Sequence, residues 1–442
     1  MVKLSGMLSQ FDPVHVLVIG DFLLDTYTTG KIKRMSPEAP VPILHVEKEE
    51  NRPGGAGNVV LNLISLGVQV TAVGRIGYDF AGKWLYGFLE TEGVNVQALL
   101  SQKGYKTSVK NRLIADSQQI LRFDHEETTP LLQDLEKKLI QQLPTLLKKV
   151  QIVAISDYGK GFLTCSLLKA VIQLAKKLSI PVIVDPKGED FSKYSGATIL
   201  KPNLSEAISA AKLLKTSPLD QVAEVIFSQC YAEMLLITRS EEGMSLFKRS
   251  GYTCDFSVPS KEVKDVTGAG DTVLAMMSIA LANQMDINHA IQLSNIAAGI
   301  AIEKLGCARV TLSNIAQRLL ELDVENKIFE EHHLFALRQS LKDVRYTVLG
   351  VDSRKGMSTA LFSTFRKLCS KKFKSKLIIY ICDTNPDQEF VLLLSSLSEV
   401  DFIVLKSESL KNLCKIMHPE HVFIMDQSEL IPLTHPMDLF VL

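Results

Sequence analysis

The nine residues Asp265–Val273, which read DVTGAGDTV, combine features that suit the binding of an anion. Two glycines flank an alanine there, at Gly268, Ala269 and Gly270, so successive backbone N–H groups stay unobstructed. An apolar run typical of a helix, Leu274–Ala282, follows at once, and a helix N-terminus adds partial positive charge. The stretch therefore predicts an anion site that needs no cationic side chain.

Asp271 lies at the rim of this site, in the first predicted helical turn. Because a carboxylate there would repel a resting phosphate, we interpret Asp271 as a general base that removes a proton from a hydroxyl. The N–H groups would meanwhile stabilise the charge on a phosphoryl group in transfer. The alternative is structural: Thr267 caps the helix, and an acidic first turn is common.

Asn203 and Glu206 stand three residues apart where a predicted strand passes into a predicted helix. Both side chains can therefore face the same crevice, and the carboxylate of Glu206 can hold Mg²⁺ through water, because Mg²⁺ prefers oxygen ligands and keeps several waters. The alternative is a helix N-terminus with an Asn or Ser cap and an early Glu.

Polar residues in three other turns suit a sugar. Gly54 and Gly55 let a polyol approach the backbone while the amide of Asn58 bonds its hydroxyls; the alternative is a turn that enters a helix. Asp21 can accept hydrogen bonds from sugar hydroxyls or simply end a strand. Lys187 can meet a phosphate or be a solvated turn residue.

Short apolar runs position these turns. The first, Val16–Ile19, leads to Asp21. Four more runs end in polar turns that contain Gly or Pro and alternate with amphipathic helical patterns: Ile152–Ile155, Val182–Val184, Thr198–Leu200 and Leu235–Ile237. Such alternation predicts an α/β fold with a doubly wound, mostly parallel sheet, in which ligands bind beyond the carboxyl ends of the strands.

Two further segments are β-prone. The first, Thr28–Glu50, contains Pro37, Pro40 and Pro42, so we expect its strands to be short or at a sheet edge. The second, Thr107–Phe123, alternates polar and apolar residues and predicts one exposed face.

Composition limits the function classes. The chain has 442 residues, 46% hydrophobic and 22% charged, and its 49 basic and 49 acidic residues balance. The balance argues against nucleic-acid binding through bulk charge. We expect no membrane span and no signal peptide. The seven cysteines form no C-x-x-C pair, which favours reduced thiols in a cytoplasmic protein.

Polar sequence between about Leu320 and Leu341 marks a domain boundary. Four strands of a second, smaller α/β unit are expected beyond it, at Tyr346–Leu349, Leu377–Ile381, Phe402–Leu405 and Val422–Met425. A basic run from Arg366 to Lys376 has no interleaved aromatic residues, so we interpret it as the solvated end of a helix.

Gly54–Asp79 and Asp265–Val273 resemble the two signatures of the ribokinase-like (PfkB) sugar kinase family, and Asn203-x-x-Glu206 resembles its metal and phosphate motif. Other blocks resemble one branch, the kinase half of the bifunctional heptose 7-phosphate kinase/heptose 1-phosphate adenylyltransferases. These blocks are Arg34–Pro42, Arg52–Ala56, Leu121–Asp124, Ser156–Gly161, Lys201–Glu206 and Thr238–Met244. The similarity runs from about Phe11 to Leu320.

This resemblance implies ATP-dependent phosphorylation of the anomeric hydroxyl of D-glycero-β-D-manno-heptose 7-phosphate, a step toward the lipopolysaccharide core. It implies Asp271 as the catalytic base, with an anion hole formed by Gly268, Ala269 and Gly270. The residues expected at ATP are Asn203, Leu204, Ser205, Glu206, Thr238, Gly243 and Asn295. Glu206 would also hold Mg²⁺ through water. The residues expected at the sugar phosphate are Asp21, Gly54, Gly55, Asn58 and Lys187.

The implied architecture is a ribokinase-like domain over residues 1–325. Its β lid would be formed from about 28–50 and 105–124, and the lid would also provide a homodimer contact. Residues 335–442 would form a Rossmann-like, nucleotidyltransferase-type domain. That domain departs from the family pattern, because no His-x-Gly-His follows its first strand, so we expect a retained fold that has lost its site. The alternatives are another sugar or nucleoside kinase of the same fold, or a non-catalytic binding or regulatory protein.

Overall fold

The computed structural model describes residues 11–116, 118–258, 263–304, 306, 309–322, 327–330, 334–341, 344–369, 375–406, 409–426 and 429–433. The chain divides into two compact units, Val14–Val310 and a second that comprises Thr311–Leu442 with the residues before Val14.

A nine-stranded sheet forms the centre of the first unit, in the order β13-β12-β11-β10-β9-β8-β1-β4-β5. Its strands are β1 (His15–Gly20), β4 (Gln69–Gly77), β5 (Asn95–Gln102), β8 (Ile152–Ser156), β9 (Val182–Asp185), β10 (Ile199–Leu200), β11 (Met234–Thr238), β12 (Met244–Lys248) and β13 (Thr253–Phe256). All neighbours from β5 to β11 are parallel, and only β12 and β13 are antiparallel. The predicted mostly parallel sheet is confirmed.

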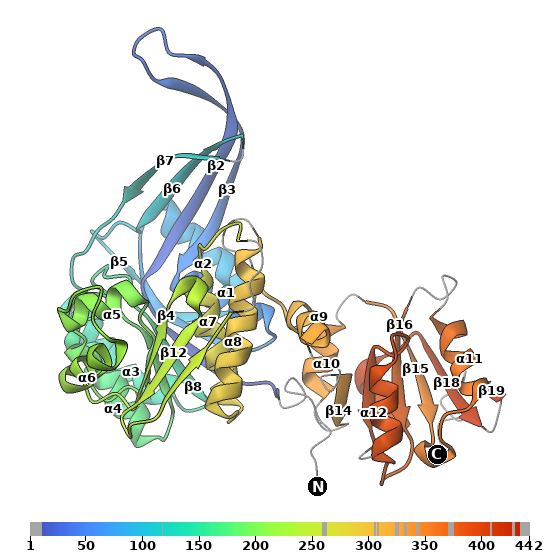
Figure 1. Ribbon diagram of the computed structural model, residues 1–442. Coiled ribbons are helices and arrows are strands. Elements are labelled where there is room, and N and C mark those ends of the chain that lie inside the picture. The colour runs from blue at the N-terminus through green and yellow to red at the C-terminus, as the bar shows by residue number, and fades with distance from the viewer. Residues whose placement is uncertain are drawn as a thin grey trace. The chain divides into compact units, whose positions relative to one another are not determined.

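Helices cover both faces of this sheet (Figure 1). They are α1 (Ala56–Ser65), α2 (Phe80–Thr91), α3 (Gln133–Leu146), α4 (Cys165–Lys177), α5 (Leu204–Ala211), α6 (Leu219–Gln229), α7 (Ala269–Ala282) and α8 (Ile287–Ile302). Apolar residues of α3 to α6 pack with Leu17, Ile155 and Val184 in one core. On the opposite face α7 packs against α1, α8, β8 and β9. Because α7 is apolar on nearly every side, it is buried, and it carries Asp271 into the interior.

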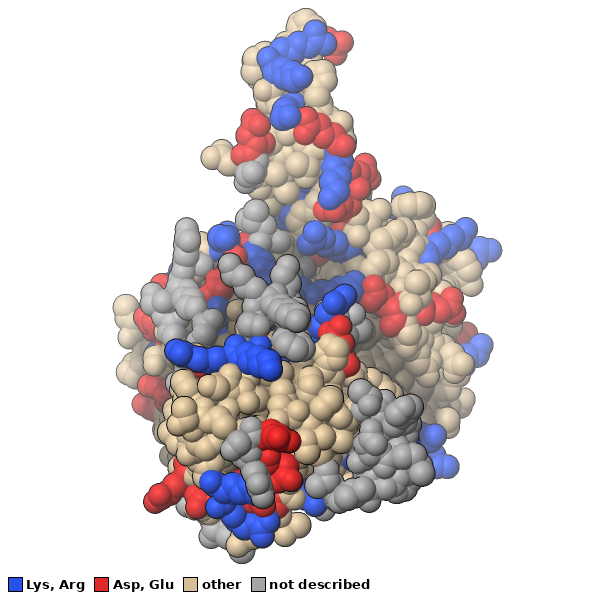
Figure 2. Space-filling model, turned by 90° about the vertical axis from the view of Figure 1, so that its right-hand side faces the viewer, with Lys and Arg blue, Asp and Glu red and all other residues tan. Residues whose placement is uncertain are grey.

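A separate four-stranded sheet, in the order β3-β2-β6-β7, contains the two segments that are expected to form the lid. Its strands are β2 (Phe22–Met35), β3 (Pro42–Gly55), β6 (Val109–Ala115) and β7 (Gln118–His125). The β2–β3 hairpin extends well beyond β6 and β7 (Figure 1). On this hairpin Figure 2 shows basic side chains mixed with acidic ones, and Lys31 pairs with Glu47 at 3.0 Å.

The expectation of short or edge strands over Thr28–Glu50 is wrong for β2, which has 14 residues and lies between β3 and β6. The prolines do not interrupt these strands, because Pro37 and Pro40 lie in the hairpin turn and Pro42 is the first residue of β3. Of the two strands in this segment, only β3 lies at a sheet edge, where a missing N–H is tolerated.

The second unit contains a six-stranded sheet in the order β14-β17-β16-β15-β18-β19. Its strands are β14 (Ile328–Glu330), β15 (Tyr346–Val351), β16 (Lys376–Ile381), β17 (Phe402–Leu405), β18 (His421–Asp426) and β19 (Glu429–Pro432). Its helices are α9 (Leu312–Leu322), α10 (Leu334–Ser340), α11 (Thr359–Leu368), α12 (Gln388–Ser396) and α13 (Leu410–Met417). The four predicted strands are present, and all pairs except β18–β19 are parallel.

The division between the compact units falls at Val310/Thr311, earlier than the boundary expected from the sequence, because α9 packs against α10. Of the basic run, Arg366 and Lys367 lie exposed in the last turn of α11, whereas Lys371, Lys372 and Lys374 lie outside the described residues. None of the helices that the structure describes is long and apolar enough to cross a membrane.

Candidate active site

The carboxylate of Asp271 lies where loops from distant parts of the first unit meet. Its side chain is buried in the first turn of α7. Oδ2 accepts a hydrogen bond from Nδ2 of Asn58 at 2.7 Å, and Oδ1 accepts one from the hydroxyl of Tyr158 at 2.9 Å. Each oxygen keeps a further lone-pair direction that can face a substrate hydroxyl.

Burial raises the pKa of Asp271 from 3.8 to about 6, and the nearby charge of Asp185 adds to the rise. The hydrogen bonds from Asn58 and Tyr158 and the charge of Lys201 oppose it. A carboxylate with a pKa of about 6 is still mostly ionised at neutral pH, yet it is a stronger base than a solvated aspartate. It is therefore well matched to proton abstraction.

The Gly-Ala-Gly stretch forms the start of α7. Gly268 is the N-cap, with a φ of 80° that a glycine adopts without strain, and no side chain caps the helix. The alternative role of Thr267 as a cap is therefore wrong. Its N–H instead donates to Oδ1 of Asp265 at 2.9 Å, which fixes the loop before the helix.

An ion pair with a buried lysine and a partly buried aspartate borders this helix start. Nζ of Lys201, after β10, lies 3.0 Å from Oδ2 of Asp185, at the end of β9. A Cβ placed on Gly270 would lie 3.5 Å from that ammonium nitrogen, so the glycine backbone and the cation are neighbours. Burial raises the pKa of Asp185, and the charge of Lys201 opposes this rise.

The residues expected at the sugar lie around the same loops. Asp21 is buried after β1, and its Oδ2 accepts hydrogen bonds from the backbone N–H groups of Tyr158 (2.9 Å) and Lys160 (3.0 Å). Burial raises its pKa, and these N–H groups oppose the rise. Gly55 has a φ of 58°, and a Cβ there would lie 2.5 Å from the carbonyl oxygen of Asp21. Gly54 similarly leaves space for the carboxylate of Asp25.

The residues expected at ATP gather beside β11 and β13. Asn203 caps α5, whose first residues are Leu204 and Ser205, and its Oδ1 accepts from the N–H of Glu206 at 2.9 Å. The carboxylate of Glu206 accepts in return from the N–H of Asn203, so the capping alternative describes the local geometry. The other oxygen of Glu206 contacts Nζ of Lys187 at 2.8 Å.

Three more of the expected ATP residues lie nearby in the fold. Thr238 bridges to Asn203 as a short parallel pair. Gly243 has a φ of 89°, and a Cβ there would clash with the carbonyl oxygen of Phe256. Asn295 of α8 donates to that same oxygen at 3.3 Å, while its own buried Oδ1 has no hydrogen-bond partner among the residues that the structure describes. That orphaned acceptor is available to a ligand that carries an N–H group.

Among the described residues, no group of three or more His, Cys, Asp or Glu side chains could hold a metal ion by itself. The carboxylate of Glu206 offers oxygen ligands of the type that Mg²⁺ prefers, and it already faces one cation, Lys187. The donor set therefore fits a Mg²⁺ that is held mainly by phosphate oxygens and water.

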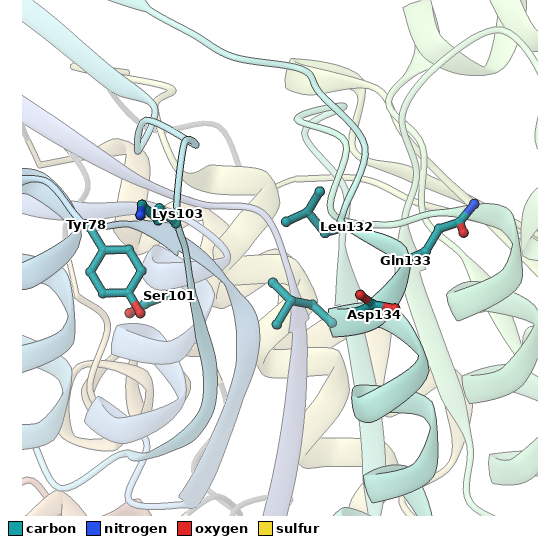
Figure 3. Close-up of a pocket in the computed structure, with 7 residues that line it drawn as sticks. Tyr78, Ser101, Lys103, Leu132, Gln133 and Asp134 are labelled. Carbon is teal, nitrogen blue, oxygen red and sulfur yellow. The ribbon is translucent and has the colours of Figure 1, made fainter.

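A hollow of about 570 Å³ lies elsewhere on the first unit. Figure 3 shows Tyr78, Ser101 and Lys103 on one side of it and Leu132, Gln133 and Asp134 on the other. It lies where β5 ends and α3 begins. Because neither Asp271 nor any other residue expected at ATP or sugar lines it, we do not assign the reaction to this hollow.

Sequence reasoning missed three members of the site: Tyr158, Asp185 and Lys201. Each follows a predicted strand in a polar turn, which was the available signal. Their mutual contacts depend on the tertiary fold.

Known proteins are similar to this chain over the unit that carries the site. The family model described as pfkB family carbohydrate kinase matches residues 15–314. The "Bifunctional protein HldE" of Trichlorobacter lovleyi is 45% identical over 328 residues, which cover 73% of this chain and 67% of the relative. For the protein of that name from Geotalea uraniireducens, the identity is 42% and the shares are 71% and 64%. For that from Aliarcobacter butzleri, the identity is 37% over 432 residues, and the shares are 93% and 89%.

Solved structures show the ribokinase-like α/β fold. Arabidopsis thaliana ribokinase complexed with ribose and ATP has a TM-score of 0.54 at 18% identity, and it covers 70% of this chain and 99% of its own. Escherichia coli phosphofructokinase-2 in complex with potassium has a TM-score of 0.57 at 21% identity, with shares of 69% and 97%. The chain belongs to the pfkB family of carbohydrate kinases.

Proposed function

We propose that this carbohydrate kinase transfers the γ-phosphoryl group of ATP to the anomeric hydroxyl of D-glycero-β-D-manno-heptose 7-phosphate, in the cytoplasm. The observation that carries the proposal is the buried carboxylate of Asp271 beside the Gly-Ala-Gly start of α7. The sequence blocks shared with the heptose kinases favour this sugar, and the HldE relatives are consistent with it.

Asp271 removes the proton from the sugar hydroxyl. Asn58 and Tyr158 each donate to one of its oxygens, so the carboxylate is oriented before the substrate arrives. The N-terminus of α7 at Gly268, Ala269 and Gly270 faces the charge that develops on the transferring group, and the ammonium of Lys201 lies beside it. Asp21, Gly54 and Gly55 form the backbone-lined wall against which the sugar rests.

ATP binds along Asn203, Thr238, Gly243 and Asn295, with the orphaned Oδ1 of Asn295 as an acceptor for an N–H group of the nucleotide. Mg²⁺, held through water at Glu206, would neutralise charge on the phosphates. Closure of the lid excludes water and so limits ATP hydrolysis. We propose that the lid also joins two copies of the chain as a homodimer.

We propose Lys187 as the contact for the phosphate that the substrate already carries. Lys110 of β6 is a second candidate, because its Nζ lies 5.4 Å from the centre of the Tyr158 ring, next to the general base. Comparing Lys187→Met with Lys110→Met on phosphorylated and unphosphorylated heptose decides between them. The variant that loses preference for the phosphorylated sugar identifies the contact.

We also propose that the second unit no longer transfers nucleotidyl groups. Such transfer needs stabilised charge on the α-phosphate and on the departing pyrophosphate. No histidine occurs between Val351 and Cys369, so the first strand–helix turn has no imidazole for this purpose. Purified protein incubated with heptose 1-phosphate and ATP should release no pyrophosphate, and its release would contradict this proposal.

Coupled ADP release measured across a panel of sugars and sugar phosphates tests the main proposal. We expect kcat/KM for heptose 7-phosphate to exceed that for ribose, fructose and adenosine by far. Comparable efficiency on an unphosphorylated sugar would favour another kinase of this fold. ATP binding without turnover of any sugar would favour a regulatory protein.

A further inference from the structure

Arg75 of β4 is a fully buried arginine, and none of the ion pairs among the described residues includes it. Its Nη2 instead donates to two backbone carbonyls, those of Lys160 at 2.7 Å and Thr129 at 2.8 Å. Its guanidinium carbon lies 3.8 Å from the centre of the Tyr105 ring. Burying a guanidinium is costly even with the charges of Asp21 and Glu127 in range, so a site that does it without a close ion pair calls for an explanation.

The peptide groups around Lys160 are held from both sides. The N–H of Lys160 donates to Asp21 at 3.0 Å, and its carbonyl accepts from Arg75 at 2.7 Å. Two residues earlier in the same loop, Tyr158 donates its N–H to Asp21 and its hydroxyl to Asp271. The position of the Tyr158 hydroxyl therefore depends on a loop that Asp21 and Arg75 clamp together.

The other contacts of Arg75 reach the base of the lid. Tyr105 precedes the segment that enters β6, and in that segment the carbonyl of Ser108 accepts from the N–H of Leu24 in β2 at 2.9 Å. The N–H and hydroxyl of Thr107 both donate to Asp79, just after β4. One buried guanidinium thus touches both the segment that leads into the lid and the loop that orients the general base.

We propose that Arg75 is a positioning residue for the phosphoryl transfer. By donating to the carbonyl of Lys160 while its guanidinium lies over the ring of Tyr105, Arg75 holds the Tyr158 hydroxyl toward Asp271 and links that loop to the base of the lid. The inference rests on the proposed kinase reaction but not on which sugar is the acceptor. If the wild-type chain phosphorylates no sugar, the proposed function fails before this inference is tested.

The test uses Arg75→Lys and Arg75→Gln in the full chain, with the best sugar acceptor. Neither side chain can reach both carbonyls and cover the ring, so we expect kcat/KM for the sugar to fall about ten- to a hundredfold, the range for a hydrogen bond to a charged group. KM for ATP should change less than about twofold, a factor within the spread of a neutral substitution. The acid limb of the pH profile should move to higher pH, because the Tyr158 hydroxyl lowers the pKa of Asp271.

Arg249 offers a matched control. Its guanidinium also donates to backbone carbonyls, those of Ala232, Phe227 and Cys230, and it also lies over an aromatic ring, but it follows β12 away from the loops at Asp271. Arg249→Gln should lower stability without moving the acid limb. A general loss of stability would therefore not imitate the predicted shift.

Tyr158→Phe completes the experiment. If Arg75 acts through the Tyr158 hydroxyl, the double variant Arg75→Lys/Tyr158→Phe should be little worse than Tyr158→Phe alone. Full additivity of the two losses, or Arg75 variants with an unmoved acid limb and unchanged kcat/KM, would overturn the inference. Should Arg75→Gln fail to fold, the comparison of Arg75→Lys with Tyr158→Phe decides the question.

Discussion

Both units of this chain contain a mostly parallel sheet with polar loops at the carboxyl ends of its strands. The charged side chains of these loops differ between the units in their burial and in their ion pairs. In the first unit, Asp271 and Lys201 are buried around the start of α7, and Lys201 pairs with the partly buried Asp185. In the second unit, Arg354 pairs with its neighbour Asp352 at 2.6 Å, and Lys355 pairs with Asp426 at 2.9 Å. The lysine and arginine of these latter pairs are largely exposed.

The pKa directions follow the same division. Burial raises the pKa of Asp271 to about 6, whereas the hydrogen bond from Arg354 lowers the pKa of Asp352. The raised value reflects a carboxylate that is held away from water, and the lowered value reflects one that is stabilised by a neighbouring cation. The same scheme of fold thus carries a buried carboxylate beside a helix start in the first unit and solvated ion pairs after β15 in the second, so the sheet alone does not determine how its loops place charge.

The largest effect should follow from Asp271→Asn. The amide preserves shape but cannot take a proton, so kcat should fall by about 10²–10⁴, while the dissociation constants of ATP and sugar phosphate change little. Coupled ADP release measures kcat, and calorimetric titration measures the dissociation constants. Asp286→Asn is the matched control, because Asp286 caps α8 by accepting a hydrogen bond from the backbone N–H of Asn288. If Asp271→Asn keeps more than half the wild-type kcat, Asp271 is not the general base, and the main difference between the two units is lost.

The next largest effect should come from breaking one ion pair in each unit, because the loss of stability should be larger in the first unit than in the second. Lys201→Met removes the buried partner of Asp185, whose own side chain is 19% exposed, and should lower the free energy of unfolding by about 2 kcal/mol. Lys376→Met breaks a 2.7 Å pair with Asp401 in the second unit, where the lysine side chain is 52% exposed, and should cost at most about 1 kcal/mol. Urea denaturation of both variants checks the difference, and equal losses would show that burial does not distinguish the pairs.

The pH dependence sharpens the contrast in pKa. Because Asp271 must be ionised to act as a base, kcat/KM should fall about tenfold per unit as the pH drops below about 6. The folded pKa lies above the unfolded value of 3.8, so ionised Asp271 disfavours folding above pH 6, and this penalty fades as the pH falls from 6 toward 3.8. At about 1.4 kcal/mol per pKa unit, the penalty is roughly 3 kcal/mol at most.

Asp271→Asn should accordingly be more stable than the wild type at pH 7.5 and lose that advantage near pH 4. Thermal unfolding at the two pH values measures this. An acid limb that lies near pH 4, or a variant with no pH-dependent advantage, would mean that the carboxylate is solvated like those of the second unit.

Local signals in the sequence predict much of this molecule. Apolar runs that end in polar turns identify the central strands of the nine-stranded and six-stranded sheets. The Gly-Ala-Gly stretch with Asp271 identifies the start of α7. These features depend on residues close together in the chain. The prediction drawn from Pro37 and Pro40 is wrong, because these prolines lie in the turn of a long hairpin and do not shorten its strands.

What the sequence does not predict is which distant groups meet. The Asp271 carboxylate bonds to Asn58, 213 residues away, and to Tyr158, 113 residues away. Arg75 lies within the recognised Gly54–Asp79 segment, yet only the fold shows that it is buried against two carbonyls. Strands β12 and β13 are short and mix polar with apolar residues, so no clear period indicates them.

The smallest effect is expected in the loop that follows β15. Arg354 and Lys355 are the only cations of the turn Asp352–Gly356, and their pairs with carboxylates are solvated. Exposed pairs of this kind often contribute nothing measurable, because water screens them and ordering two long side chains costs entropy. The double variant Arg354→Ala/Lys355→Ala should therefore leave the melting temperature and the kinase kcat/KM unchanged within error. A clear loss of kinase turnover in this variant, with unchanged stability, would show that the second unit takes part in the reaction, and the contrast between an active and a silent sheet edge would have to be abandoned.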